Sequence, residues 1–259
     1  MDSLINGIGF INILAILATS VAAGFLGVFL VMRRMSLVSD ALSHVALPGL
    51  ALALLWNIQP FFGAFAFLLV GIVLIYLIQQ RTNLPADAIV GVLFTASLAV
   101  GILLTPEPEL LEALFGDFTK ISSFEAWTAI IVSLLVLAGT IFSSRTLMFS
   151  IAAPDLGHVS KARLKTVEFI FLVMVALIVA LGIKFVGTLL MGTLTIIPAA
   201  AAKNISKSFA AFCVSSIVIA ALSVFLGLAA SYWLDILAGP AVILAGVFLF
   251  LLTLVSKRA

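Results

Sequence analysis

The chain has 259 residues, of which 64% are hydrophobic and only 9% are charged, whereas soluble domains carry about 25% charged residues. A soluble core could not hide this much apolar surface, so the composition excludes an ordinary soluble protein. The net charge of +2 is small and comes from Lys and Arg in short connectors, which argues against a nucleic-acid-binding protein. The single cysteine, Cys213, lies inside an apolar segment and is expected to be a small buried hydrophobic residue.

Apolar runs of about 20 residues, the length that crosses a hydrocarbon layer of about 30 Å, recur along the whole chain. We therefore predict an all-α polytopic membrane protein with one transmembrane domain over residues 1–259. The first run follows Asp2 without any Lys or Arg, unlike a signal peptide, and is interpreted as an uncleaved span. The stretches on either side of Gly187 have almost no polar break between them, so eight or nine spans are expected. The predicted spans cover residues 9–31, 38–56, 60–79, 87–104, 124–142, 167–185, 186–202, 209–231 and 238–255.

The basic residues predict the orientation, because cytoplasmic loops carry an excess of Lys and Arg. With the N-terminus outside and nine spans, the C-terminus is cytoplasmic and most basic residues fall inside. Only Lys120 and Lys184 then lie outside, and the 105–123 connector on that side is acidic. Lys184 is expected to extend its ammonium group to the outer interface. The expected location is a cell membrane that the chain crosses several times.

One connector on the predicted inner side, Ser143 to Thr166, is longer than the others. It combines a basic end and Pro154 with apolar residues, which are Leu147, Met148, Phe149 and Ile151. Apolar residues beside charges indicate either a docking surface for a cytoplasmic partner or a short amphipathic helix on the lipid headgroups. Both interpretations remain open from the sequence.

Asp40 and His44 are the ionisable residues that stand out in this apolar chain. On a helix they lie one turn apart on the same face, with about 6 Å between their Cβ atoms. Arg33 and Arg34 mark the expected membrane boundary, which places the pair toward the middle of the bilayer, where ionisable groups usually face a cavity or a partner. Pro48 cannot donate to the carbonyl of His44. Carboxylate, imidazole and carbonyl together could bind a divalent cation.

Three interpretations of this pair remain open. In the first, Asp40 and His44 bind a metal ion, and hydroxyl groups nearby add contacts, those of Ser36, Ser39 and Ser43. In the second, Ser36 or Ser39 caps the helix, Asp40 lies in its first turn and His44 is a packing residue. In the third, the pair relays protons.

The other polar residues are weaker candidates. Asp87 is expected in the first turn of a helix after Pro85, Glu168 is expected to pair with Lys165, and His158 is expected to be solvated. The segment from Gly182 to Asn204 is rich in Gly and Ala, which predicts close helix packing. Phosphate loops, H-E-x-x-H, G-x-S-x-G and paired intramembrane aspartates are missing from the sequence, so we do not expect an enzyme.

The segment "RRMSLVSDALSHVALPGLALA" (Arg33 to Ala53) closely resembles the signature of membrane permeases from bacterial ABC importers for zinc, manganese and related metals. The resemblance continues in order through "DAIVGVLFTASLAVGILL" (Asp87 to Leu104), "LFGD", "KFVGTLLMGTLTIIPAAAA" and "LAGPAVILAGVF". It implies a fold related to type II ABC importer permeases, located in a bacterial inner membrane. It also implies a homodimer that works with two cytoplasmic ATPase subunits and an extracytoplasmic metal-binding protein. It also implies that Asp40 and His44 coordinate the transported metal, and that the 143–166 connector contacts the ATPase.

Two other classes of function remain alternatives. An ion-coupled secondary metal transporter would need no ATPase, but it would usually carry several acids at depth. A non-transporting membrane scaffold would not need Asp40 and His44. No permanently bound cofactor is expected, and one Asp and one His suit zinc, manganese and ferrous iron alike.

Overall fold

The structure, a computed structural model, describes residues 9–82, 84, 86–104, 113–116, 121–152 and 161–256. Within these ranges the chain forms helices and short connectors, and it contains no strand. The nine long helices of this part of the chain are α2 (Phe10–Met32), α3 (Ser36–Leu55), α4 (Pro60–Arg81), α5 (Ala86–Leu104), α7 (Ser123–Ala152), α8 (Lys161–Val186), α9 (Thr188–Ile205), α10 (Phe209–Leu234) and α11 (Ala238–Ser256). The prediction of an all-α polytopic fold is confirmed.

Each predicted span corresponds to one helix. Seven of the described helices are long and apolar enough to cross a membrane, and Ala88–Leu104 within α5 is a shorter apolar helix. The helix α9 is polar at its end, where Lys203 and Asn204 lie in the last turn. These helices agree with the expected eight or nine spans.

The break between α8 and α9 falls at Gly187, where the sequence has almost no polar interruption. Gly187 adopts φ +85° and ψ 166°, a conformation that side-chain-bearing residues rarely adopt. A Cβ at this position would also collide with the backbone carbonyl of Leu114. A glycine is therefore required both for the turn and for the close approach, and the chain forms two helices here instead of one.

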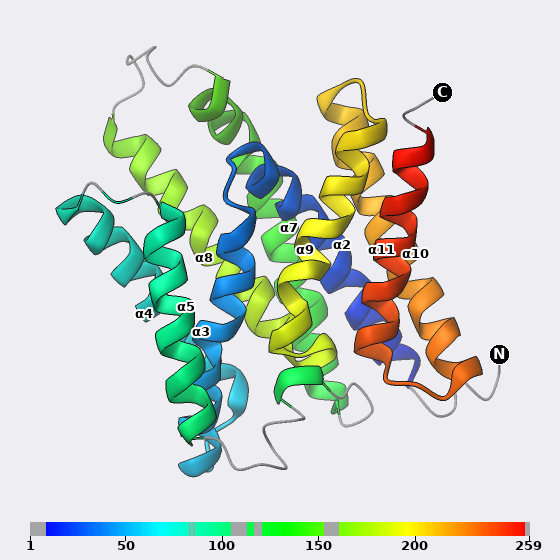
Figure 1. Ribbon diagram of the computed structural model, residues 1–259, viewed down its shortest axis with the longest axis horizontal. Coiled ribbons are helices and arrows are strands. Elements are labelled where there is room, and N and C mark those ends of the chain that lie inside the picture. The colour runs from blue at the N-terminus through cyan, green and yellow to red at the C-terminus, as the bar shows by residue number, and fades with distance from the viewer. Residues whose placement is uncertain are drawn as a thin grey trace.

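The helices are arranged in two neighbouring groups (Figure 1). In one group α3 packs against α4 and α5, and in the other α10 packs against α11, α9 and α2. The contact between α3 and α9 and the contacts of α8 with α4, α2 and α9 join the groups. Consequently α3, which carries Asp40 and His44, lies among helices of both groups.

Several basic residues lie at helix ends on one side of the bundle. Figure 1 shows the C-terminal ends of α2, α4, α9 and α11 at the same end of the bundle. Arg33 caps α2, Arg81 lies in the last turn of α4 and Lys203 lies in the last turn of α9. The basic residues at these three helix ends therefore lie at the same end of the bundle.

The connector predicted to begin at Ser143 is shorter in the structure. The helix α7 continues to Ala152, where the predicted span ended at residue 142, and α8 begins at Lys161. Leu147 is fully buried and Met148 packs against the core, so part of the apolar patch serves the packing of α7. Residues 153–160, which include Pro154 and His158, lie outside the described residues.

Candidate metal site

The helix α3 begins directly after a tight turn that follows α2. Arg33 closes α2, and Arg34 adopts the left-handed conformation with φ 57°. The N-cap of α3 is Met35, and no side chain caps this end by a hydrogen bond. Asp40 is the fifth residue of the helix and lies beyond its first turn, in which no acidic residue is found. The interpretation of Ser36 or Ser39 as a cap with Asp40 at the helix end therefore has no support in the geometry.

His44 is buried inside the bundle, with 4% of its surface exposed. Its ring meets the ring of Phe94 from α5 edge-on, with 4.6 Å between the centroids and 83° between the planes. Its Nδ1 atom is buried and has no hydrogen-bond partner among the described residues. In a histidine that serves only packing, this nitrogen would normally have a hydrogen-bond partner. An imidazole whose Nδ1 is unpartnered can instead coordinate a metal ion.

Asp40 lies one turn before His44, at the contact between α3 and α9. A Cβ added to Gly192 of α9 would meet the Cα, Oδ1 and Cβ atoms of Asp40, so the glycine lets the two helices approach at this point. The backbone carbonyl of Asp40 accepts a hydrogen bond of 2.6 Å from the Ser43 hydroxyl. Asp40 is only partly buried, in contrast to its neighbours Ser39 and Ala41. The carboxylate therefore lies on a face of α3 that the neighbouring helices cover only in part.

Pro48 lies inside α3 and does not end the helix. Because its nitrogen carries no hydrogen, the carbonyl oxygen of His44 lacks the usual donor one turn later. The predicted set of carboxylate, imidazole and backbone oxygen therefore occurs within two turns of one helix. No group of three or more His, Cys, Asp or Glu side chains that could hold a metal exists among the described residues. One copy of the chain offers two such side chains, Asp40 and His44.

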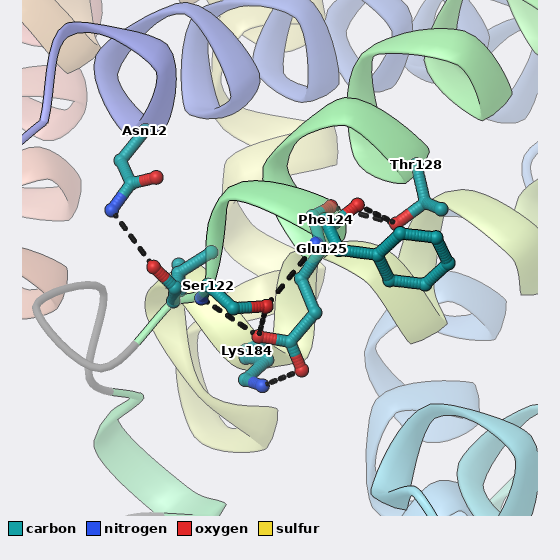
Figure 2. Close-up of polar contacts among 7 residues, drawn as sticks. Asn12, Ser122, Phe124, Glu125, Thr128 and Lys184 are labelled. Carbon is teal, nitrogen blue, oxygen red and sulfur yellow. Dashed lines mark hydrogen bonds and ion pairs between the residues drawn. The ribbon is translucent and has the colours of Figure 1, made fainter.

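A second polar cluster, which the sequence did not predict, lies at the opposite end of the bundle from Arg33. Lys184, near the end of α8, forms an ion pair with Glu125 at the start of α7. Figure 2 shows Glu125 between Lys184 and Ser122, whose backbone N–H and hydroxyl each donate a hydrogen bond of 2.9 Å to Oε2 of Glu125. The Asn12 amide donates to the carbonyl of Ile121 next to this cluster. The cluster therefore ties the ends of α2, α7 and α8 together.

The position of Lys184 could be predicted in part from the sequence. Lys184 was expected to extend its ammonium group to the outer interface, and no partner was predicted for it. Its side chain is in fact 38% exposed and that of Glu125 is 20% exposed. A cavity of about 390 Å³ between α3, α4, α7 and α8 has mainly apolar walls and includes both residues in its lining. Asp40 and His44 do not line this cavity.

A further ion pair lies at the end of the bundle where α3 begins. The guanidinium of Arg33 lies 3.3 Å from the carboxylate of Glu168 on α8, and it also lies over the ring of Phe171 at 5.6 Å. Burial lowers the pKa of Arg33, while the charge and the hydrogen bond of Glu168 oppose this shift. Glu168 was expected to pair with Lys165, whose side chain lies outside the described residues.

The remaining sequence candidates take structural places. Asp87 is the second residue of α5, as expected for a first-turn acid, although its side chain is not among those described. Cys213 is a buried free cysteine within α10, as predicted. His158 lies outside the described residues.

The fold defines a polytopic α-helical membrane protein with an ionisable pair inside its helix bundle. Residues 9–257 match the family described as "ABC 3 transport family", and the chain belongs to this family. The prediction from the Arg33–Ala53 signature is confirmed.

Three known proteins illustrate the relationship. The "High-affinity zinc uptake system membrane protein ZnuB" of Haemophilus influenzae is 31% identical over 238 residues, which cover 90% of this chain and 91% of that protein. The "Manganese import system permease protein ScaB" of Streptococcus parasanguinis is 31% identical over 241 residues, 92% of this chain and 86% of that protein. The solved structure "PsaBC from Streptococcus pneumoniae in complex with Fab" matches with a TM-score of 0.86 at 24% identity, covering 97% of this chain and 94% of that one, and shows the same fold.

Proposed function

We propose that the chain is the transmembrane permease subunit of an ATP-driven importer of a divalent transition metal ion, namely zinc, manganese or ferrous iron. The single observation that carries this proposal is the place of Asp40 and His44 one turn apart on α3, inside the bundle, with the imidazole Nδ1 unpartnered among the described residues. The relatives named for zinc and manganese uptake support the class of cargo.

The proposed metal site is completed by a second copy of the chain. Asp40 and His44 supply one carboxylate and one imidazole, whereas a tetrahedral zinc site needs four donors. Two copies related by a two-fold axis along the pathway would supply two carboxylates and two imidazoles. The absence of a third acidic, His or Cys donor near the pair in the described part of one copy supports this arrangement. The partly buried edge at Asp40 is where the second copy would face the ion.

The proposed transport cycle uses two further partners. An extracytoplasmic metal-binding protein delivers the ion to the outer face, and cytoplasmic ATPase subunits contact the segment between α7 and α8. With the N-terminus outside, the basic ends of α2, α4 and α9 face the cytoplasm, as the excess of Lys and Arg predicts. Nucleotide-driven movement at the inner ends of α7 and α8 then changes the access to Asp40 and His44. The permease itself carries out no ATP hydrolysis.

Replacement of His44 tests the metal site. We expect His44→Ala to abolish uptake of Zn²⁺ and Mn²⁺ by cells that depend on this permease, while the amount of protein in the membrane stays the same. Cys213→Ala changes a buried residue on a different helix, α10, and should leave uptake unchanged. Normal uptake by the His44 variant would remove the metal site from the proposal.

The ATPase partner separates this proposal from an ion-coupled secondary transporter. Membrane vesicles that contain the assembled importer should accumulate metal only when ATP is supplied on the cytoplasmic side. Dissipation of the proton and sodium gradients should leave this accumulation intact. Accumulation driven by a gradient without ATP would favour the secondary transporter.

A further inference from the structure

The contact between Gly192 and Asp40 fixes how α9 lies against α3. The two helices run in opposite directions (Figure 1). One helical turn advances about 5.4 Å along the helix axis. A step of one turn forward along α3 and one turn backward along α9 therefore reaches the same height in the bundle. On α3 this step leads from Asp40 to His44, and on α9 it leads from Gly192 back to Thr188. Thr188 and Gly192 lie on the same face of α9, since residues four apart are neighbours on a helix surface.

The hydroxyl of Thr188 is an unusual buried polar group. Thr188 is fully buried, and its Oγ1 atom has no hydrogen-bond partner among the described residues. Other buried threonines donate to a carbonyl of their own helix, as Thr19 does to Ala15 at 2.9 Å and Thr140 does to Val136 at 2.8 Å. Thr188 is the first residue of α9 and has no earlier turn of its own helix to donate to.

Three buried polar atoms on α3 and α9 are left without a hydrogen bond in the part of the chain that the structure describes. Besides Oγ1 of Thr188, these are Nδ1 of His44 and Oγ of Ser39, both buried and without a partner among the described residues. Ser43, by contrast, uses its hydroxyl within α3. Buried polar atoms are generally hydrogen-bonded or bind an ion or water. Because the helix register places His44 and Thr188 at the same level, their unpartnered atoms indicate a place for a polar ligand.

We propose that the Thr188 hydroxyl is a third donor of the metal site, supplied by α9 from the side opposite α3. This inference rests on the proposed function of Asp40 and His44 and extends it to a second helix. The hydroxyl adds an oxygen to the carboxylate oxygen of Asp40 and the nitrogen of His44. Oxygen donors suit Mn²⁺, whereas imidazole suits Zn²⁺, so Thr188 favours transport of Mn²⁺ relative to Zn²⁺.

Thr188→Val tests this role because valine keeps the shape of the side chain and removes the hydroxyl. The assembled importer is reconstituted in liposomes, and ATP-dependent uptake is measured separately with Mn²⁺ and Zn²⁺ at sub-saturating concentration. Loss of a group that supports a metal site typically lowers affinity or activity by about 10- to 100-fold. We expect a loss of about 10-fold for Mn²⁺, a smaller loss for Zn²⁺, and recovery of Mn²⁺ uptake in Thr188→Ser.

Two controls make the outcome decisive. Thr140→Val removes an equally buried hydroxyl that is already bonded within α7, and its uptake should equal that of the unchanged protein. His44→Ala reports on the proposed function itself. If His44→Ala abolishes uptake while Thr188→Val transports both metals normally, the role of Thr188 is overturned and the proposed function stands. The role of Thr188 would also be overturned if Thr188→Ser lost as much uptake as Thr188→Val, or if Thr140→Val lost as much as Thr188→Val. Normal uptake by His44→Ala would overturn the proposed function.

Discussion

Gly192 of α9 lies directly against Asp40 of α3, so that a Cβ on the glycine would come within 2.7 Å of the Asp40 Cβ and still closer to its Cα. The obstacle includes the Cα and Cβ atoms of Asp40, which cannot rotate away as the end of a flexible side chain can. A methyl group here would force the two helices apart. Overpacking of a close contact typically costs about 1–3 kcal/mol.

The first prediction is that Gly192→Ala inactivates transport. The variant should insert into the membrane in normal amounts but lose most uptake of Zn²⁺ and Mn²⁺, since the carboxylate is displaced from its position near His44. Gly246→Ala in α11 is the matched control, because its new Cβ would lie 3.2 Å from the Ser223 hydroxyl and 3.4 Å from an Ile197 methyl. The control should retain uptake. Full activity of Gly192→Ala would show that the position of Asp40 is unimportant.

The second prediction concerns the orientation of the imidazole by Phe94. An edge-to-face aromatic pair contributes about 1 kcal/mol beyond its buried area, which corresponds to about 5-fold in affinity. Phe94→Leu should therefore raise the metal concentration needed for half-maximal uptake by about that factor and leave the maximal rate nearly unchanged.

Phe65→Leu provides the comparison for Phe94. Phe65 is also partly buried and also contacts an aromatic ring, that of Phe61, but on α4. The two substitutions should destabilise the protein by similar amounts, whereas only Phe94→Leu should change the metal dependence. An equal change in both variants would indicate a general loss of packing instead of an effect on His44.

The helices could be predicted from the sequence because the membrane requires long apolar segments that satisfy their own backbone. No polar residue marks the break at Gly187. The need for a glycine becomes clear only in the structure, where the carbonyl of Leu114 lies against it. The end of α7 was placed too early, because Arg145 interrupts the apolar run although Leu147 still packs into the core. The Asp40 and His44 pair was visible as two ionisable residues at helical spacing.

The contacts made by these residues could not be predicted. Gly192 meets Asp40 only because α9 returns against α3 in the fold, and no local pattern encodes that register. The same holds for Lys184, which appeared as a lone cation near an interface. Its partner, Glu125, lies at the start of a different helix. A single sequence shows which residues are costly to bury, but the packing of distant helices decides which of them meet.

The third prediction concerns this pair of Glu125 and Lys184. Lys184→Met and Glu125→Gln should each lower the thermal stability of the purified protein, since Glu125 also accepts two hydrogen bonds from Ser122. The side chain of Lys184 is 38% exposed, so solvent weakens the attraction, and a double-mutant cycle should give a coupling of about 1 kcal/mol or less. Lys207→Met, at an exposed lysine, should have no effect. A coupling of zero would mean that the ion pair does not hold α7 against α8.

The fourth prediction concerns Arg33 and its neighbour Arg34, which carry the same charge at the same end of the bundle. Only Arg33 is largely buried, with 11% of its side chain exposed, and only its guanidinium contacts Glu168 and Phe171. Arg33→Gln removes a charged hydrogen bond and a cation–π contact, which together contribute about 2 kcal/mol. Arg34→Gln removes an exposed charge and should change stability by less than about 0.5 kcal/mol.

Arg33 also connects α8 to the turn from which α3 begins, seven residues before Asp40. In the proposed cycle, movement at the start of α8 would pass through Glu168 and Arg33 to this turn. We therefore expect Arg33→Gln to lower metal uptake more than it lowers ATP hydrolysis by the assembled importer, whereas Arg34→Gln should change neither. Measurement of both rates in the same liposomes gives the number of metal ions moved per ATP. A parallel fall of the two rates would indicate that Arg33 stabilises the fold without linking α8 to the metal site.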